Sequence, residues 1–466
     1  PPPLCREFWG PHEAGWYRGD PRGGLQRLQT PGEGTPKNWL RRAATRVLLP
    51  QGFPDSVSPD YAQYQLWDGL QALCSSLAGS LSTRAVLQAV GVGDGTATVT
   101  GATLTWVLRD GVGIVTRIGF VWLQGSRLDC EAKQWRLAAD LLNDLALTLE
   151  LLAPHWLSAG PALLALAASA KCVVGVAGGA TRAALAVHQA RRDNVADVAA
   201  KDASQETLVN GAGLLLSLLL LPLLDGRPWL TWAVLALLLG THLGANLGAV
   251  AALTLPTLNR PRLRLAIGWA LRGGGAESRQ RGVAFRGSGV TLEVPRPEQV
   301  NPREPLLPGF STRLHLHLGA PLEQLVTSEA EFQKALECGS PDYVIVLRPS
   351  RGWVGVGLRR GCPPETPLIS GAQALLLEEL LGPDLDPRTP LGGLLGPLQR
   401  RLRGCPPGSV PWGVLAETTR LWQRLGPALL QGLAAAGWDT QRPLLAPDEW
   451  RLQWAGPAPG GGVAKP

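Results

Sequence analysis

The sequence lacks methionine altogether and has very little lysine. Its 44 basic residues include only six lysines, at Lys37, Lys133, Lys171, Lys201, Lys334 and Lys465, so the cationic charge is almost all arginine. The chain also holds 57 glycines and 40 prolines. This bias fits a GC-rich coding sequence, and composition alone therefore indicates no function.

The sequence also lacks the short motifs of enzymes, metal sites and nucleic-acid-binding proteins. It has no HExxH, GxSxG or P-loop motif, so we assign no catalytic residues and expect no enzymatic activity. The seven cysteines form no CxxC pair and are odd in number, so we expect no disulfide framework, no metal and no cofactor. The net charge of +7 comes without a nucleic-acid-binding motif, so we expect no nucleic-acid partner.

Long apolar stretches dominate the middle of the chain. Six of them lie at residues 65–91, 96–123, 137–153, 161–187, 207–224 and 229–255. A membrane-spanning helix needs about 20 residues, and most of the six are long enough. The weakest, 137–153, carries Asp140, Asp144 and Glu150 and also fits an amphipathic helix lying against the others. The pattern predicts a multi-pass helical membrane domain, and a soluble domain with buried helices is the alternative.

Basic residues are concentrated in every second loop, on one predicted side of the membrane. With six spans and the N-terminus inside, the outer loops hold only Arg227. The inner flanks hold Arg41, Arg42, Arg46, Arg127, Lys133, Arg136, Arg191, Arg192, Lys201, Arg260, Arg262 and Arg264. Because cytoplasmic loops are enriched in Lys and Arg, this favours an integral membrane protein with a cytoplasmic N-terminus and C-terminal domain.

Some charged and polar residues lie within or between the candidate spans. Charges at membrane depth usually face a cavity or a partner, so they are candidates for a solute site. The polar stretch HQARRDNVADVAAKDASQETLVN, residues 188–210, has neither Gly nor Pro and is predicted to continue as a helix entering the bundle from the cytoplasm. The proposed site residues are Arg84, Arg109, Asp110, Asp140, Asp144, Lys171, Arg182, His188, Arg191, Asn194, Asp197, Lys201, Asp202, Gln205, Glu206 and Asn210.

Two short matches indicate an internal repeat. STRAVLQAVG at 82–91 resembles ATRAALAVHQ at 180–189, and RDGVG at 109–113 aligns with VNGAG at 209–213. Three spans per repeat would give the halves opposite topology, the 3+3 inverted repeat of many secondary transporters, with a site between the halves. Chance matches in a chain rich in Ala, Gly and Leu are the alternative.

Composition changes on both sides of the apolar region. Residues 1–47 are predicted to be a disordered basic arm, 48–256 the helical membrane domain, 257–305 a basic Gly/Pro-rich linker and 456–466 a disordered tail. Residues 306–455 contain strand-like RLHLHLGA, YVIVLRP and WVGVGLR, then helix-like ALLLEELL and LAETTRLWQRLGPALLQGLAAAGW. The fold class is therefore mainly α, with a small α+β soluble domain at the C-terminal side.

Several segments strongly resemble the root UVB sensitive (RUS) family. They are LPQGFPDSVSPDYAQYQLWDGLQALCSSLAGSLSTRAVL at 49–87, LDCEAKQWRLAADLLND at 128–144, residues 170–210, and AGWDTQRPLLAPDEWRLQW at 436–454. The resemblance covers about residues 48–455 and is closest to the animal member of the family. It implies a membrane-associated protein, and plant members are linked to ultraviolet-B sensing in roots, auxin transport and vitamin B6 homeostasis. It implies no catalytic residue.

Two hypotheses about function follow. The first is a membrane carrier for a small anionic solute such as a phosphorylated B6 vitamer, because arginine binds phosphate bidentately. The second is a membrane scaffold whose C-terminal domain binds a protein partner or a related RUS-family subunit, with the polar residues serving helix association. Both place the chain in a lipid bilayer. An intramembrane enzyme has the least support.

Overall fold

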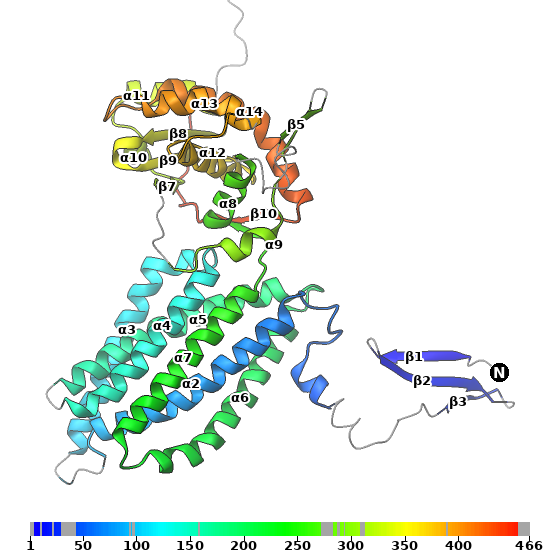
Figure 1. Ribbon diagram of the computed structural model, residues 1–466, viewed down its shortest axis with the longest axis vertical. Helices are drawn as coiled ribbons and strands as arrows, with labels where there is room; N and C mark the ends of the chain where they lie inside the picture. The colour runs from blue at the N-terminus through cyan, green and yellow to red at the C-terminus, as the bar shows by residue number, and fades with distance from the viewer. Residues whose placement is uncertain are drawn as a thin grey trace, which may run out of the picture. The chain divides into compact units, whose positions relative to one another are not determined.

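The chain divides into two compact units, Pro1–Leu253 and Thr254–Pro466, which we call the helical unit and the C-terminal unit. The computed structural model describes residues 4–9, 12–20, 23–28, 43–92, 95, 98–156, 159–271, 283–286, 289–292, 294–307, 313–387 and 390–454 (Figure 1). The predicted tail at 456–466 lies outside these residues.

A small antiparallel sheet lies where the sequence analysis expects a disordered arm. Its strands are β1 (Cys5–Trp9), β2 (His12–Gly19) and β3 (Leu25–Leu28), in the order β1-β2-β3. The expectation of disorder does not hold for these strands. Side-chain contacts between neighbouring strands stabilise the sheet, and they form only once the strands pair. The Arg6 guanidinium lies 5.3 Å from the Trp16 ring, and the Tyr17 hydroxyl donates to Glu7 at 3.0 Å.

All six predicted apolar segments form helices of the helical unit. They are α2 (Tyr61–Ala89), α3 (Val99–Gln124), α4 (Ala132–Leu152), α5 (Gly160–Gln189), α6 (Val195–Leu224) and α7 (Pro228–Ala252). Of these, α5, α6 and α7 are long and apolar enough to cross a membrane. Helices α2 and α3, at 29 and 26 residues, and α4, at 21, also have the length of a span but are less apolar.

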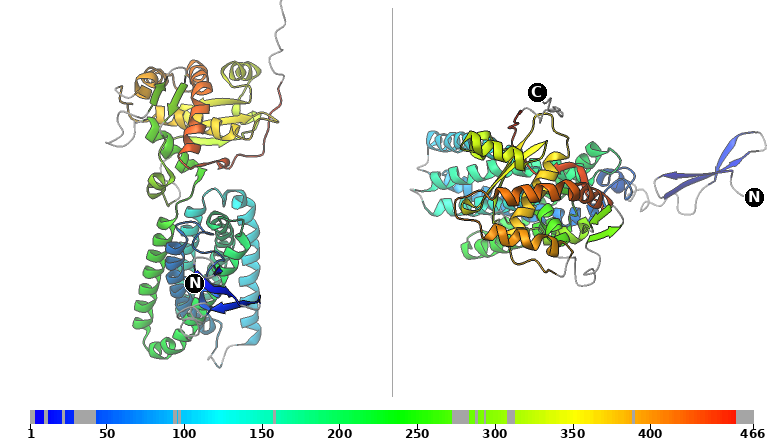
Figure 2. Two further views of the ribbon diagram at one scale, coloured as in Figure 1. Left: turned by 90° about the vertical axis from the view of Figure 1, so that its right-hand side faces the viewer. Right: turned by 90° about the horizontal axis from the view of Figure 1, so that it is seen from above.

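Successive helices run in opposite directions through the helical unit. Contacts between α2 and α4 join residues 68 or 69 apart, such as Ser82 with Glu150, and contacts between α2 and α6 join residues 137 apart, such as Ser80 with Ser217. A constant separation means that α2, α4 and α6 are parallel. The helices lie side by side in Figures 1 and 2. One end of the bundle therefore gathers the first residues of α2, α4 and α6, and the other gathers those of α3, α5 and α7.

Close packing of α2 against α7 requires a glycine. A Cβ on Gly248 would lie 2.7 Å from Cδ2 of Trp67, so only glycine admits the indole ring at this distance. Small residues that let helices approach closely are typical of helix pairs in membranes. Helix α2 also packs against α4 and α6, and α5 packs against α3 and α4.

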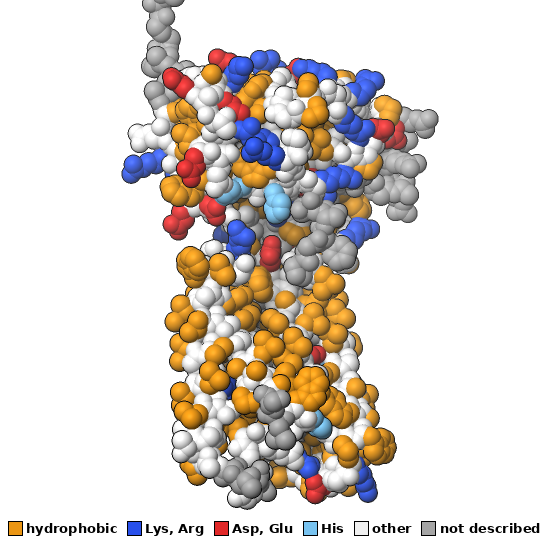
Figure 3. Space-filling view, turned by 90° about the vertical axis from the view of Figure 1, so that its left-hand side faces the viewer, with side chains coloured by type: hydrophobic (Ala, Val, Ile, Leu, Met, Phe, Trp, Pro, Cys, Tyr) orange, Lys and Arg blue, Asp and Glu red, His pale blue; other side chains and the backbone are white. Residues whose placement is uncertain are grey.

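The outer faces of the helical unit are strongly apolar. On α6, Leu215, Leu218 and Leu219 are each more than two-thirds exposed, and on α3 Val115 and Trp122 are exposed still more. Figure 3 shows such side chains covering one face of the unit with few charged groups among them. Water-soluble monomers rarely expose apolar patches of more than a few hundred Å². These faces suit contact with lipid.

The polar stretch at 188–210 is not one continuous helix. Helix α5 ends at Gln189 and α6 begins at Val195, with a turn between them. Asp193 adopts a positive φ of 52° in this turn. Aspartate tolerates the left-handed region better than most residues, so the chain reverses without Gly or Pro. The prediction of an uninterrupted helix was wrong for this reason.

The C-terminal unit combines a three-stranded sheet with surrounding helices. The sheet has the order β7-β9-β8, with β7 (His315–Leu318) parallel to β9 (Trp353–Leu358) and β8 (Tyr343–Arg348) antiparallel to β9. The three predicted strands are thus confirmed, and β8 and β9 pair as a hairpin. The remaining elements are β4 (Thr257–Asn259), α8 (Arg260–Leu271), β5 (Val283–Arg286), β6 (Gly289–Leu292), α9 (Pro297–Val300), α10 (Leu322–Leu325), α11 (Glu329–Cys338), α12 (Thr366–Leu380), α13 (Pro390–Arg403), α14 (Trp412–Ala435) and β10 (Asp439–Leu444).

Part of the predicted linker belongs to the core of the C-terminal unit. Leu258, Leu263 and Ile267 of β4 and α8 are buried against the sheet and its helices. The arginines that suggested a solvated linker are paired: Arg262 is 1% exposed and bonds to Glu304 at 3.2 Å, while Arg264 lies 3.4 Å from Glu378. The linker prediction was wrong for 257–271, because acidic partners distant in sequence pair with Arg262 and Arg264 and allow the apolar residues beside them to join the core.

Candidate solute site in the helical unit

Helix α4 turns a polar face into the bundle. Arg136, Asp140 and Asp144 recur every four residues and therefore lie on one face of the helix. Arg136 and Asp140 are buried, and Glu150 near the end of the helix is 1% exposed. A surface helix would point such a face to water. Here it packs against α2, α5 and α7.

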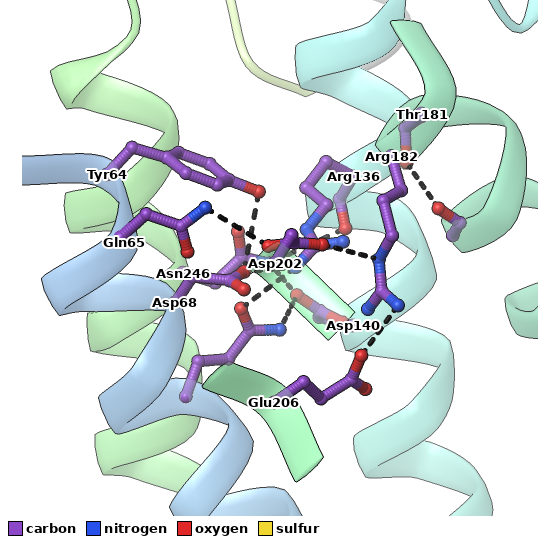
Figure 4. A network of polar contacts seen from close by, with 12 residues as sticks. Tyr64, Gln65, Asp68, Arg136, Asp140, Thr181, Arg182, Asp202, Glu206 and Asn246 are labelled. Atoms are coloured by element: carbon purple, nitrogen blue, oxygen red, sulfur yellow. Dashed lines mark hydrogen bonds and ion pairs between the residues drawn. The ribbon is translucent and has the colours of Figure 1, made fainter. Parts of the chain in front are cut away.

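The first part of this face forms a set of contacts that we call the Arg136 cluster (Figure 4). Arg136 is paired with Asp68 of α2 and lies 3.4 Å from the side-chain oxygen of Gln71. Asp140 accepts hydrogen bonds from the amides of Gln71 and of Asn246 on α7, both on its Oδ2 atom. The other members of the Arg136 cluster are Tyr64, Gln65, Asp144, Arg182, Asp202, Glu206 and His242.

The Arg136 cluster reaches the surface of the bundle between α5 and α6. Arg182 on α5 lies 2.6 Å from Glu206 and 3.5 Å from Asp202, both on α6. Asp202 also accepts a hydrogen bond from Gln65 of α2 at 3.1 Å. The Arg182 side chain is 43% exposed and that of Asp202 13%, so polarity extends from an open rim to the buried Asn246.

Carboxyl groups outnumber arginines in the Arg136 cluster. Asp68, Asp140, Asp144, Asp202 and Glu206 face only Arg136 and Arg182, and His242 lies 2.9 Å from Asp144. A buried charge is stable only when it is paired and hydrogen-bonded, so this surplus of carboxyl groups favours a cationic group in any ligand that enters the cluster.

Two buried atoms beside Asp140 are among the side-chain atoms of the cluster that have no hydrogen-bond partner in the described residues. They are the side-chain oxygen of Asn246, an acceptor, and Nε of Arg136, a donor. Buried polar atoms without partners are rare and costly. A donor and an acceptor beside Asp140 are what a small polar molecule would need to be held here.

A second group of charges, the Glu150 cluster, lies farther along α4. Glu150 accepts from Lys171 of α5 at 2.5 Å and from Ser82 of α2, and it lies 3.7 Å from Arg109 of α3. The Arg109 guanidinium also stacks 4.6 Å from the Trp106 ring. Between Asp140 and Glu150, the Asn143 amide of α4 donates to the Ser75 hydroxyl of α2 at 3.4 Å. Polar groups therefore follow α4 for about 21 Å, at 1.5 Å per residue.

The structure brings together some of the predicted site residues and separates others. Asp140, Arg182, Asp202 and Glu206 meet in the Arg136 cluster (Figure 4), Asp144 joins it beside His242, and Arg109 meets Lys171 at Glu150. Arg84 lies at the far end of α2, paired with Asp225. Asp110 and Arg191 are exposed.

Four of the predicted site residues in the 188–210 stretch hold the chain segment that precedes α2: His188, Asp197, Lys201 and Gln205. His188 lies 2.9 Å from Asp60, and the Asp197 carboxylate accepts from the backbone N–H of Gln51 at 2.7 Å. The side chains of Lys201 and Gln205 donate to carbonyls of Arg46 and Leu48, while Asn194 accepts from the N–H of Arg192 and the Asn210 carbonyl from Ser76. These contacts are structural and do not form an open site.

Sequence reasoning missed the partners that complete both clusters. They are Asp68, Gln71, Arg136, Glu150, His242 and Asn246. Arg136 was assigned to a cytoplasmic flank. The four-residue spacing of Arg136, Asp140 and Asp144 within an otherwise apolar helix is the signal that could have identified it.

Comparison with known proteins gives consistent matches over almost the whole chain. The family described as "Vitamin B6 photo-protection and homoeostasis domain" matches residues 35–272, and "Root UVB sensitive protein, C-terminal" matches residues 293–454. No solved structure matches.

Individual relatives agree with these matches. The chain is 39% identical to RUS family member 1 of Dictyostelium discoideum. The aligned region covers 62% of this chain and about half (52%) of that relative. It is 33% identical to Protein root UVB sensitive 3 of Arabidopsis thaliana over 90% of its length and 87% of the relative.

Proposed function

Because this chain belongs to the root UVB sensitive (RUS) family, we propose that it is a multi-pass membrane carrier for a small solute of the vitamin B6 class. The observation that carries the proposal is the Arg136 cluster, a buried polar site inside a bundle whose outer faces are apolar. Ionisable groups at membrane depth are costly and typically mark the path of a solute or ion.

The chemistry of the cluster indicates which solute groups it would hold. A protonated ring nitrogen pairs well with a carboxylate, and aspartate is the usual partner of the pyridinium of vitamin B6 cofactors. Asp140 and the unpartnered Asn246 oxygen offer such an acceptor. Arg182, at the open rim, would bind a phosphate after releasing Glu206. The excess of carboxyl groups shifts the expected solute from a simple anion to one that also carries a cationic group.

The helix boundaries support the 3+3 repeat that the sequence matches predict. Helices α2, α3 and α4 end at Ala89, Gln124 and Leu152, and α5, α6 and α7 end at Gln189, Leu224 and Ala252, each 100 residues later. Opposite directions of α2 and α5 are what an inverted repeat requires. In such carriers the solute lies between the halves. The Arg136 cluster draws on both, since Asp68 and Asp140 belong to the first and Arg182 and Asn246 to the second.

Uptake into liposomes tests the proposal. Full-length protein should give saturable uptake of pyridoxal 5′-phosphate or of an unphosphorylated B6 vitamer. Arg182→Gln should reduce uptake of the phosphorylated form at least tenfold, because one charge-assisted contact contributes about 1.5–3 kcal/mol. Arg117→Gln, an exposed arginine on α3, is the matched control. No flux of any vitamer and no thermal stabilisation by them would refute the carrier proposal.

Cysteine labelling tests the six-span topology. In a background without the native cysteines, single cysteines at Asp129 and Arg191 should react with a membrane-impermeant maleimide from one side only, and one at Trp156 from the other. All three positions are exposed, and they lie at opposite ends of the alternating helices. Equal reactivity of all three from one side would contradict a multi-pass arrangement.

The second candidate function is a membrane scaffold. It is favoured by the pairing of most cluster charges with one another, as helix association alone would require. A scaffold needs the ion pairs for assembly but has no use for the charge of Asp140, and this difference separates the two functions.

A further inference from the structure

A cavity of about 160 Å³ lies at the end of the helical unit where α2, α4 and α6 finish and α7 begins. One ordered water needs roughly 10–15 Å³ by this measure, so the cavity has room for a small chemical group. Polar groups on its wall come from Arg84, Gln88, His155, Arg227 and Thr231, and Trp232 supplies an aromatic face. Arg84 lies sixteen residues beyond Asp68 on α2, about 24 Å away, so this cavity is separate from the Arg136 cluster.

The side chains of the cavity favour an anion. Two arginines and a histidine line it, and the positive end of α7, which begins at Pro228, adds to their field. Arg84 is paired with Asp225, whose carboxylate is 75% exposed. An exposed ion pair contributes about 0–1 kcal/mol, so a phosphate can displace this carboxylate. Arg227 donates to the Leu223 carbonyl at 3.3 Å, a contact that leaves further N–H groups for a ligand.

Exposed aromatic and aliphatic residues surround the cavity. Trp156 and Trp229 are 59% and 72% exposed, and Leu223 is 62% exposed. Tryptophan is enriched at the level of lipid headgroups in membrane proteins. The apolar wall of Leu81, Leu151 and Leu224 continues from the cationic groups toward the bundle. Charge and position together suit a phosphate attached to a larger organic group.

We infer that this cavity binds the phosphate group of a phosphomonoester or phosphodiester, through Arg227, His155 and Arg84. Both arginines can make charge-assisted hydrogen bonds to phosphate oxygens. The phosphate can come from an anionic phospholipid of the surrounding membrane or from a soluble phosphate ester. The inference does not use the solute site proposed above.

Binding to the full-length protein in detergent tests the inference. Native mass spectrometry and thermal melting would be measured with phosphatidylglycerol, phosphatidylcholine, inorganic phosphate and pyridoxal 5′-phosphate. We expect phosphatidylglycerol or a soluble phosphate to bind and raise the melting temperature. The double variant His155→Gln/Arg227→Gln should weaken that binding at least tenfold. Gln88→Glu, an isosteric change at an exposed wall position, should weaken it as well, through repulsion alone.

Each outcome separates the possibilities. Binding of phosphatidylglycerol alone identifies a lipid headgroup, binding of soluble phosphates alone identifies a free ester, and binding of both supports recognition of the phosphate itself. Arg117→Gln, an exposed position on α3, should leave the affinity for phosphatidylglycerol and for inorganic phosphate unchanged. Absence of binding by all probes, or equal affinity of the wild type, the double variant and Gln88→Glu, would overturn the inference.

Discussion

Replacing Arg136 with leucine is expected to lower the free energy of unfolding of the helical unit by about 3–5 kcal/mol, the cost of leaving a buried ion without its partner. The side chain is 7% exposed and is paired with Asp68, which is itself buried. Removing the guanidinium leaves that buried carboxylate with the Tyr64 hydroxyl, which lies 3.4 Å away, and without its charged partner. The melting temperature of the purified protein and its yield in detergent should both fall.

Two variants control this result. Arg117→Leu, at an exposed position on α3, should change the free energy of unfolding by no more than about 0.5 kcal/mol. The double variant Asp68→Leu/Arg136→Leu should recover most of the loss, because replacing a whole buried pair with apolar residues is often neutral or stabilising. A single Arg136→Leu protein that melts like the wild type would show that the pair is not formed.

The second large effect is expected from Asp140→Asn, and it falls on solute binding rather than on stability. Gln71 and Asn246 both donate to the same oxygen of Asp140, so an asparagine oxygen can accept both bonds. The substitution therefore keeps the shape and the hydrogen bonds and removes the charge. Affinity for a B6 vitamer should fall about tenfold to a hundredfold, the equivalent of one charged contact at about 1.5–3 kcal/mol.

The matched control is Asp110→Asn, which removes an exposed carboxylate on α3. It should bind solute as the wild type does. Solute affinity can be measured by the rise in melting temperature with increasing vitamer concentration. A ligand that binds only the folded protein stabilises it more as its concentration rises above its Kd. If Asp140→Asn melts well below the wild type instead, the charge of Asp140 has a structural role, and its assignment as the solute-binding group is refuted.

The positions of the six helices could be predicted because apolar composition is a local property. Their contacts could not, because the partners of α4 lie about 68 residues earlier on α2 and over a hundred residues later on α7. The sequence shows Asp140 and Asp144 but does not show that Gln71, Asn246 and His242 surround them. Helix 137–153, considered the weakest span, supplies the central side chains of the candidate site.

Some of the basic residues that predicted the membrane orientation are buried in protein contacts. Lys133 is buried and donates to the Leu253 carbonyl at 2.7 Å, and Arg262 is buried in the C-terminal unit. These residues count toward the cytoplasmic flanks, yet protein contacts determine their positions. Arg127, Arg191 and Arg192 are exposed at one end of the helical unit. These three arginines still favour a cytoplasmic location for that end.

The proposed role of Asp140 in binding a transported solute is tested most directly by the initial rate of B6 vitamer uptake into liposomes. The liposomes would contain equal amounts of wild type, Asp140→Asn or Asp110→Asn. We predict uptake by the wild type and by Asp110→Asn, and loss of at least nine-tenths of it in Asp140→Asn with an unchanged melting temperature. Equal uptake by all three proteins, or none by the wild type, would contradict this role.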